Sequence, residues 1–89
     1  MEGRAVDRST IVEDLQRAAD EVLGEDAPTI DERLALGDDA EIDSLDLIEI
    51  SMVIEERYSI AFEPSDLDGV TSIGDVVDVI LGKVAAAGG

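Results

Sequence analysis

Apolar residues recur at helical spacing near the start of the chain. Four of them, three or four residues apart, predict one buried helical face: Ile11, Leu15, Ala18 and Val22. Thr10 and Glu13 fit a capping box at the start of this helix, and Gly24 is a typical helix stop. The pattern therefore predicts a first helix over about residues 10–23.

The stretch from Ser44 to about Tyr58 predicts a second helix, capped at its start by Asp43. At about 100° per residue, one side of this helix holds an apolar stripe: Leu47, Ile50, Ile54 and Tyr58. A second apolar stripe lies on the side that carries Ser44: Leu45, Ile48 and Met52. Three glutamates flank this second stripe: Glu49, Glu55 and Glu56.

The two stripes of the second helix allow two interpretations. A central helix in a small bundle can be buried on both sides, which is a reasonable explanation for Ile48. Burial of the whole second stripe would also bury the flanking glutamates, at a substantial cost in free energy. An exposed apolar patch with an acidic rim fits better, and this layout is typical of a docking surface for a basic partner. The flexible side chain of Met52 suits such a surface.

Two further helices are predicted toward the end of the chain. Pro64 and Ser65 begin a single-turn helix through Leu67, which Gly69 stops. Thr71 or Ser72 caps the last helix, whose buried stripe has four members: Ile73, Val76, Val77 and Ile80.

A long connection separates the first two predicted helices. Residues 25–42 contain Pro28, Gly37 and many acids, which indicates a loop, and three apolar residues anchor it in the core: Ile30, Leu34 and Leu36. The predicted fold is therefore all-α, a small four-helix bundle of three main helices and one short one. We expect one domain over residues 1–89, with residues 1–8 and 85–89 as frayed tails.

The composition excludes several classes of function. The chain of 89 residues has 23 acidic and 6 basic residues and a formal net charge of -17, so binding to nucleic acid or to an anionic membrane is not expected, whereas basic proteins are attracted. The acids concentrate in residues 38–68, where eleven of them accompany a single base, Arg57. The chain has no cysteine and no histidine, which removes thiolate metal sites, cysteine nucleophiles and the usual general base.

The hydropathy pattern predicts neither a signal peptide nor a membrane-spanning segment. The first nine residues lack the apolar centre of a signal peptide, and no apolar run reaches transmembrane length. A monomeric cytoplasmic protein is the natural expectation.

Ser44 stands where the long loop ends and the second helix begins, beside the second apolar stripe. A serine in this position is most often a helix cap. The position also suits modification, because a phosphodiester there would meet free backbone N–H groups and the positive end of the helix dipole.

The tetrapeptide Asp43-Ser44-Leu45-Asp46 resembles the attachment motif of acyl carrier proteins. The similarity extends over about residues 9–84 and includes a helix opening, a helix close and several single positions: Ser9-Thr10-Ile11, Leu23-Gly24, Glu49, Met52, Glu55-Glu56, Thr71 and Ile73. A bare Asp-Ser-Leu is a weak signal, but the tetrapeptide within this helix pattern and charge is a strong one.

This resemblance implies that Ser44 carries 4′-phosphopantetheine, which a separate phosphopantetheinyl transferase transfers from coenzyme A. The thiol of the arm would hold acyl groups as thioesters, so that the protein would be a carrier and not an enzyme. The partners would be the transferase, a ketosynthase, and an acyltransferase or acyl ligase with basic surfaces. Eight residues would form the docking face: Asp43, Leu45, Asp46, Ile48, Glu49, Met52, Glu55 and Glu56.

Several positions depart from the pattern of fatty-acid carriers. Ile42 stands where many of them have a small residue, and Ala40-Glu41 replaces a Leu-Gly pair. Leu47 replaces a small or polar residue near the arm, and Arg57 replaces an acid. These departures favour a specialised pathway, such as polyketide or related antibiotic biosynthesis, over primary fatty-acid synthesis.

Other interpretations of the sequence compete with that of a carrier. A calcium-binding loop beginning at Asp39 would have Ser44 where glycine is needed and Ile50 where a bidentate glutamate belongs, so no metal site is expected. A carboxylate-only hydrolase fits poorly, because the acids are dispersed on helix faces. An aminoacyl or peptidyl carrier stays open, as does an acidic interaction module in which Ser44 is never modified.

Overall fold

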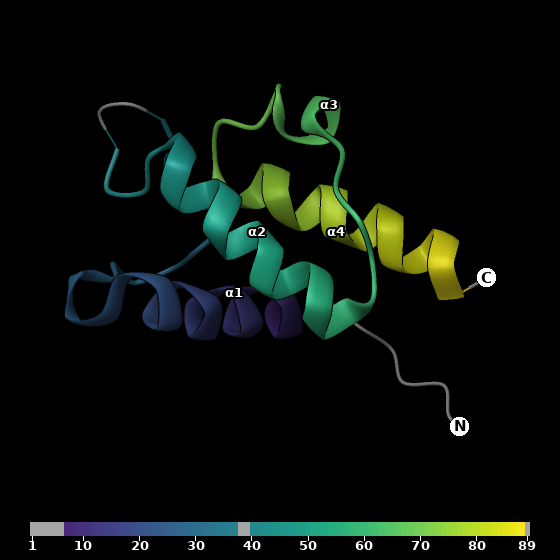
Figure 1. The fold of residues 1–89 in the computed structure, drawn as a ribbon, viewed down its shortest axis with the longest axis horizontal. Helices are drawn as coiled ribbons and strands as arrows, with labels where there is room; N and C mark the ends of the chain where they lie inside the picture. Colours follow the sequence, from purple (N-terminus) through teal and green to yellow (C-terminus); the bar gives the residue numbers. More distant parts are fainter. Residues whose placement is uncertain (1–6, 38–39, 89) are drawn as a thin grey trace.

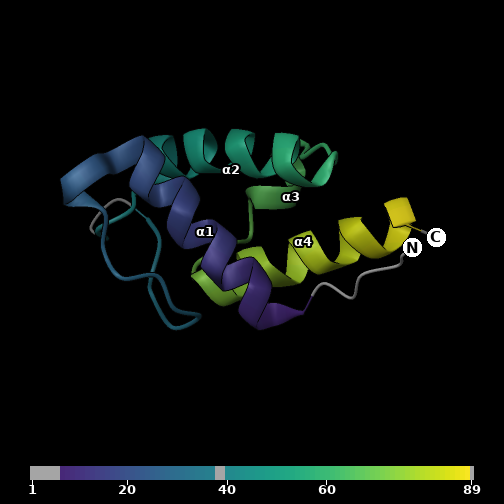
Figure 2. The same ribbon diagram turned by 90° about the horizontal axis from the view of Figure 1, so that it is seen from below.

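The computed structural model describes residues 7–37 and 40–88. This part of the chain is helical and contains no strand, which confirms the predicted all-α fold. Figure 1 shows its elements in order: α1 (Arg8–Leu23), the 3-10 turn η1 (Gly24–Asp26), α2 (Ser44–Tyr58), α3 (Pro64–Leu67) and α4 (Ile73–Gly88). Helix α1 packs against both α2 and α4, and Figure 2 shows the short α3 between α2 and α4.

The start of α1 differs from the prediction. The helix begins at Arg8, and the side chain of Asp7 caps it by accepting a hydrogen bond from the Thr10 N–H at 2.9 Å. The predicted capping box of Thr10 and Glu13 is therefore wrong, because Thr10 lies inside the helix. The other end of α1 agrees with the prediction, since Gly24 follows it with a φ of 61°, a conformation that favours glycine.

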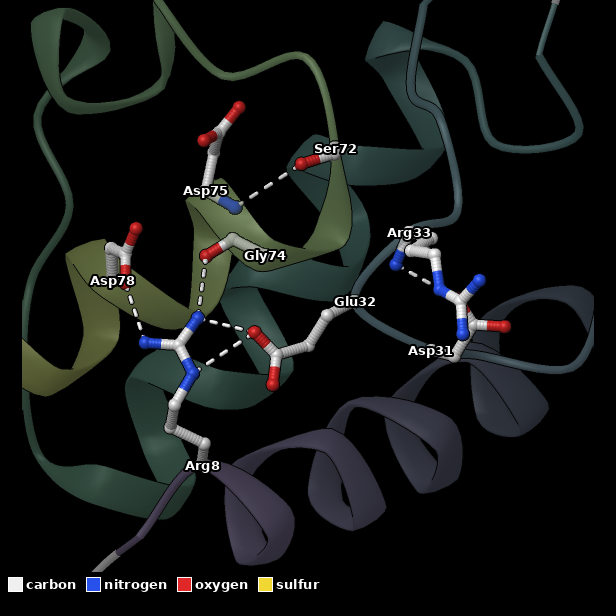
Figure 3. A network of polar contacts seen from close by, with 8 residues as sticks. All are labelled: Arg8, Asp31, Glu32, Arg33, Ser72, Gly74, Asp75 and Asp78. Atoms are coloured by element: carbon white, nitrogen blue, oxygen red, sulfur yellow. Dashed lines mark hydrogen bonds and ion pairs between the residues drawn. The ribbon is translucent and has the colours of Figure 1, made fainter.

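Arg8 is an anchor of the fold and not part of a frayed tail, as Figure 3 shows. Its guanidinium donates to Glu32 in the long loop, to Asp78 in α4 at 2.6 Å and to the Gly74 carbonyl oxygen at 3.4 Å. These contacts raise the pKa of Arg8 and lower the pKa of Glu32, so both groups are charged at neutral pH. Residues 1–6 of the predicted tail lie outside the described residues.

The last helix extends into the segment that sequence analysis assigned to a frayed tail. Helix α4 continues to Gly88 through a run of alanines, the residue with the highest helix propensity. The prediction gave more weight to the glycines at the end of the chain than to these alanines. Residue 89 lies outside the described part.

The loop between η1 and α2 runs along the start of α4. The N–H groups of Ile73 and Gly74 donate to the carbonyl oxygens of Leu34 and Glu32, each at 2.9 Å. A Cβ atom on Gly74 would lie 3.1 Å from the Glu32 carbonyl oxygen, so a side chain at this position would crowd the close approach of the loop. Of the three predicted loop anchors, Ile30 is buried, and Leu34 and Leu36 are partly buried against the core.

The core is made from one face of each long helix and from two loop residues. Its buried hydrophobic members are Ile11, Leu15, Ala18, Ala19, Ile30, Ile42, Leu47, Ile50, Ile54, Ile73, Val76, Val77 and Ile80. The predicted stripes of all three long helices contribute, with Val22 and Tyr58 only partly buried. Ile42 is fully buried, so a residue that sequence analysis treated as a departure near the motif is a core residue.

Both short connections near α4 use side-chain caps. Glu63 and Asp66 form a capping box around α3, which sequence analysis did not predict. At the start of α4, Ser72 Oγ accepts from the Asp75 N–H at 3.4 Å, and the Asp75 carboxylate accepts from the backbone N–H and the hydroxyl of Thr71 at 3.0 and 3.1 Å. Thr71 and Ser72, the two predicted candidates for this cap, thus both take part.

We expect Ile54→Ala to lower the free energy of unfolding by about 2–5 kcal/mol, because its fully buried side chain would leave a cavity in the core. Met52 on the same helix is 58% exposed and provides the matched control, Met52→Ala, which should change that free energy by less than about 0.5 kcal/mol. Urea denaturation measures both. Equal destabilisation by the two substitutions would contradict the assignment of the buried face.

Asp75→Asn should destabilise the protein in a pH-dependent way. The hydrogen bonds from Thr71 lower the pKa of the Asp75 carboxyl below its usual value. Its contribution to stability is therefore present above the unfolded-state pKa of about 4 and is lost as the pH falls through the lower folded-state pKa. Thermal unfolding between neutral and strongly acidic pH should show a difference between the two proteins that is largest near neutrality and shrinks in acid; a constant difference would contradict this.

Candidate functional site

Ser44 is the first residue of α2, and it is exposed. Asp43 precedes it as the helix cap, as predicted: Asp43 Oδ1 accepts from the Asp46 N–H at 2.9 Å, and its carbonyl oxygen accepts from the Leu47 N–H at 2.9 Å. The first N–H groups of a helix have no partner within the helix. Ser44 is thus held at the positive end of α2 by a rigid cap, with its side chain accessible.

A hollow opens beside Ser44, between α2, α3 and the end of the long loop. Its volume is about 340 Å³, and ten residues line it: Leu36, Gly37, Asp43, Ser44, Leu47, Ile48, Pro64, Leu67, Asp68 and Val70. A second hollow of about 250 Å³ shares Ile48, Pro64 and Leu67 with the first and continues along α2 to Glu55 and Phe62. Together they form one mostly apolar groove, the α2–α3 groove, with Ser44 at one end.

The second apolar stripe of α2 is exposed, as its glutamate rim predicts. Leu45, Ile48 and Met52 are 65%, 50% and 58% exposed. Glu49 and Glu56 beside them are exposed as well, and Asp46 is half-buried. The structure therefore brings six of the eight predicted docking residues onto one accessible surface of α2 without giving them a partner in the core.

The remaining two predicted docking residues, Asp43 and Glu55, have structural hydrogen bonds. Asp43 caps α2, and Glu55 Oε2 accepts from the Phe62 N–H at 2.7 Å. Glu55 is half-buried and ties α2 to the segment that leads into α3. Helical spacing placed Glu55 on the rim, but it could not reveal this contact with a residue seven positions later in the chain.

Arg57 lies in the last turn of α2, and its side chain points toward α1. Its Nη1 is 3.8 Å from Oδ1 of the buried Asp14, and the hydroxyl of Tyr58 donates to the other oxygen of the same carboxylate. Arg17 of α1 also approaches Asp14, at 3.7 Å. Arg57, which interrupts the acidic rim, therefore has an ion-pair partner where α1 and α2 pack together. The sequence pattern did not predict this contact.

Two kinds of site find no support in the part of the chain that the structure describes. Within residues 7–37 and 40–88, no group of three or more acidic, histidine or cysteine side chains could hold a metal ion. Among the same residues, no helix combines the length and the apolar character needed to cross a membrane.

Comparison with known families decides what kind of protein has this helix and this exposed serine. The family model described as the phosphopantetheine attachment site matches residues 13–80, most of the folded chain. The chain belongs to the acyl carrier protein family. Members of this family hold 4′-phosphopantetheine covalently and are carriers, not catalysts, so this acyl carrier protein is not an enzyme.

Individual relatives agree with this assignment. An acyl carrier protein of Saccharopolyspora erythraea is 35% identical over 80 residues, which cover 90% of this chain and 84% of the relative. One from an Exiguobacterium species is 34% identical over 77 residues, 86% of this chain and 98% of the relative. A meromycolate extension acyl carrier protein of Mycobacterium leprae is 33% identical over 76 residues, 85% and 66% of the two chains. As an acyl carrier, the protein works with enzymes of the synthase type.

Proposed function

We propose that Ser44 carries the 4′-phosphopantetheine arm and that the carrier presents acyl groups on it to synthase enzymes. The observation that carries this proposal is the position of Ser44: it is exposed, stands first in α2 within Asp43-Ser44-Leu45-Asp46, and lies at one end of the α2–α3 groove. When bound, the arm supplies a thiol that holds acyl groups as thioesters.

The residues around Ser44 fit this group. A phosphodiester on the Ser44 hydroxyl would lie at the positive end of the α2 dipole, which stabilises negative charge there. The cap by Asp43 holds the backbone on either side of Ser44 in place at the start of the helix. The apolar walls of the groove, including Leu47 and Leu67, are placed to shelter the acyl chain of a folded-back arm from water.

The exposed face of α2 is the proposed docking surface. Leu45, Ile48 and Met52 would fill apolar pockets of a partner, and the acids around them would attract its basic residues before contact. The partners proposed are a phosphopantetheinyl transferase, a ketosynthase, and an acyltransferase or acyl ligase. Because Asp43 and Glu55 have structural hydrogen bonds, direct ion pairs with a partner rest mainly on Asp46, Glu49 and Glu56.

We propose further that this carrier acts in a specialised pathway, polyketide or related secondary-metabolite biosynthesis. The departures of the sequence from the fatty-acid pattern support this, and one of them, Leu47, forms part of the groove wall that an acyl chain would touch. Parallel elongation assays with ketosynthases of fatty-acid and polyketide type would test it. Faster elongation by the fatty-acid enzyme would favour the alternative of a primary fatty-acid carrier.

Incubation with coenzyme A and a promiscuous phosphopantetheinyl transferase should raise the intact mass by one phosphopantetheine. Ser44→Ala should abolish this increase. Ser65→Ala is the matched control, because Ser65 is also an exposed serine in the first turn of a helix but lies outside the Asp-Ser-Leu-Asp tetrapeptide. An unchanged mass of the wild-type protein would contradict the carrier function and favour an interaction module.

The combined substitution of Glu49 and Glu56 by lysine should slow loading by a cognate partner enzyme by roughly tenfold at low salt, since rim charges act mainly on association. Both side chains are exposed, so the fold should persist. Glu13→Lys on the exposed side of α1 makes the same change of charge as each single substitution on α2, and it should have little effect. Equal loading rates for the variant and the wild-type protein at low salt would show that this face does not dock.

A further inference from the structure

Helix α3 forms one wall of the α2–α3 groove, yet it has little apolar attachment of its own. It consists of four residues, Pro64–Leu67, and none of them is buried. Leu67, its most apolar member, is only half-buried because it faces the groove. A helix this short is not stable by itself, so its position depends on the contacts that hold it.

Two polar contacts hold α3 in place. On the side of α2, Glu55 binds the Phe62 N–H in the segment before α3. On the side of α4, Lys83 Nζ is 2.8 Å from Asp66 Oδ2, with both side chains about one quarter exposed. The same Asp66 oxygen accepts from the Glu63 N–H at 2.7 Å, so the ion pair also supports the capping box.

The Lys83–Asp66 pair lies behind the groove and not in it. Pro64 and Leu67 line both hollows of the groove, whereas neither Asp66 nor Lys83 lines either of them. Lys83 instead projects from α4, and Figure 2 shows α3 between α4 and α2. The ion pair therefore holds α3 to α4, and its two side chains do not contact the interior of the groove.

We propose that the Lys83–Asp66 ion pair sets how far the α2–α3 groove can open, and thereby determines the length of acyl chain that the carrier shelters. This inference rests on the proposed function, in which the groove holds the chain attached through Ser44. A longer chain needs a wider groove, and α3 can move outward from α4 or α2 only if one of its polar contacts is broken.

Charge strengthens the effect of this pair. Lys83 is one of 6 bases against 23 acids in the chain. Three of these acids lie on or beside α3: Glu63, Asp66 and Asp68. Hydrogen bonding to Glu63 and Lys83 lowers the pKa of Asp66, so its carboxylate is charged at neutral pH. Removal of Lys83 would leave these carboxylates without their cation, and their mutual repulsion would favour a displaced α3.

The test compares wild-type carrier with Lys83→Met, which keeps the apolar stem of the side chain and removes its charge. Both are loaded with hexanoyl, decanoyl and hexadecanoyl phosphopantetheine, and loading is verified by intact mass. Cleavage of the thioester by hydroxylamine, which yields a hydroxamate and the free thiol, then reports how exposed the thioester is. We expect Lys83→Met to slow cleavage of the hexadecanoyl carrier several-fold relative to wild type and to leave the hexanoyl carrier unchanged.

Two controls separate the ion pair from general effects. Lys83→Arg retains a cation and should restore the wild-type dependence on chain length. Arg33→Met removes an exposed base from the long loop, with the same change of net charge, and should behave as wild type. Identical dependence on chain length in Lys83→Met and wild type would overturn the proposal.

A measurement on the unmodified protein distinguishes this proposal from the proposed function. Amide hydrogen exchange should accelerate several-fold in Lys83→Met at Asp66 and Val70, whose N–H groups bond within and just after α3, and stay unchanged in α1. If no arm can be attached but exchange accelerates, the proposed function fails while the role of the pair in holding α3 stands. Unchanged exchange in α3 would overturn the proposal whatever the loading shows.

Discussion

Helix α2 must bury one apolar face and leave a second apolar face exposed, and the rest of the structure follows from how it does so. Leu47, Ile50 and Ile54 pack into the core, while Leu45 and Met52 remain in solvent. In so small a domain the apolar residues of α1, α4 and the long loop are all needed to cover the first face. Only the short α3 is left for the other side, and it covers that side incompletely, so that the groove and the exposed patch are neighbours on α2.

Three of the basic residues lie where they hold separate elements together. Arg8 joins the start of α1 to the long loop and to α4, Arg57 joins α2 to α1, and Lys83 joins α4 to α3. With a net charge of -17, the elements of this chain repel one another over most of their surface. Single ion pairs at exposed positions contribute little, but each of these bridges residues distant in sequence. Their role is therefore to fix the relative positions of elements more than to add overall stability.

The sequence was sufficient for the helices, the buried stripes and the exposed patch, because each depends on local spacing. It was insufficient wherever a side chain acts across the fold. Arg8 was assigned to a tail because its acidic partners are 24 and 70 positions away. Glu55 was assigned to the docking rim because helical spacing places it there, while its hydrogen bond to Phe62 depends on the path of the following loop. Ile42 looked like a local departure until the fold placed it in the core.

These long-range contacts also change how the docking face must be probed. A charge reversal at Glu55 would break its hydrogen bond to Phe62 and shift the segment before α3, so a slower reaction could arise from a changed groove as well as from lost attraction. Charge reversals at Glu49 and Glu56 do not have this ambiguity, because both side chains are exposed on α2. In the proposed function, the same helix therefore separates two roles by face: its exposed acids would govern how fast a partner arrives, and the contacts around α3 would govern what the groove beside Ser44 can hold.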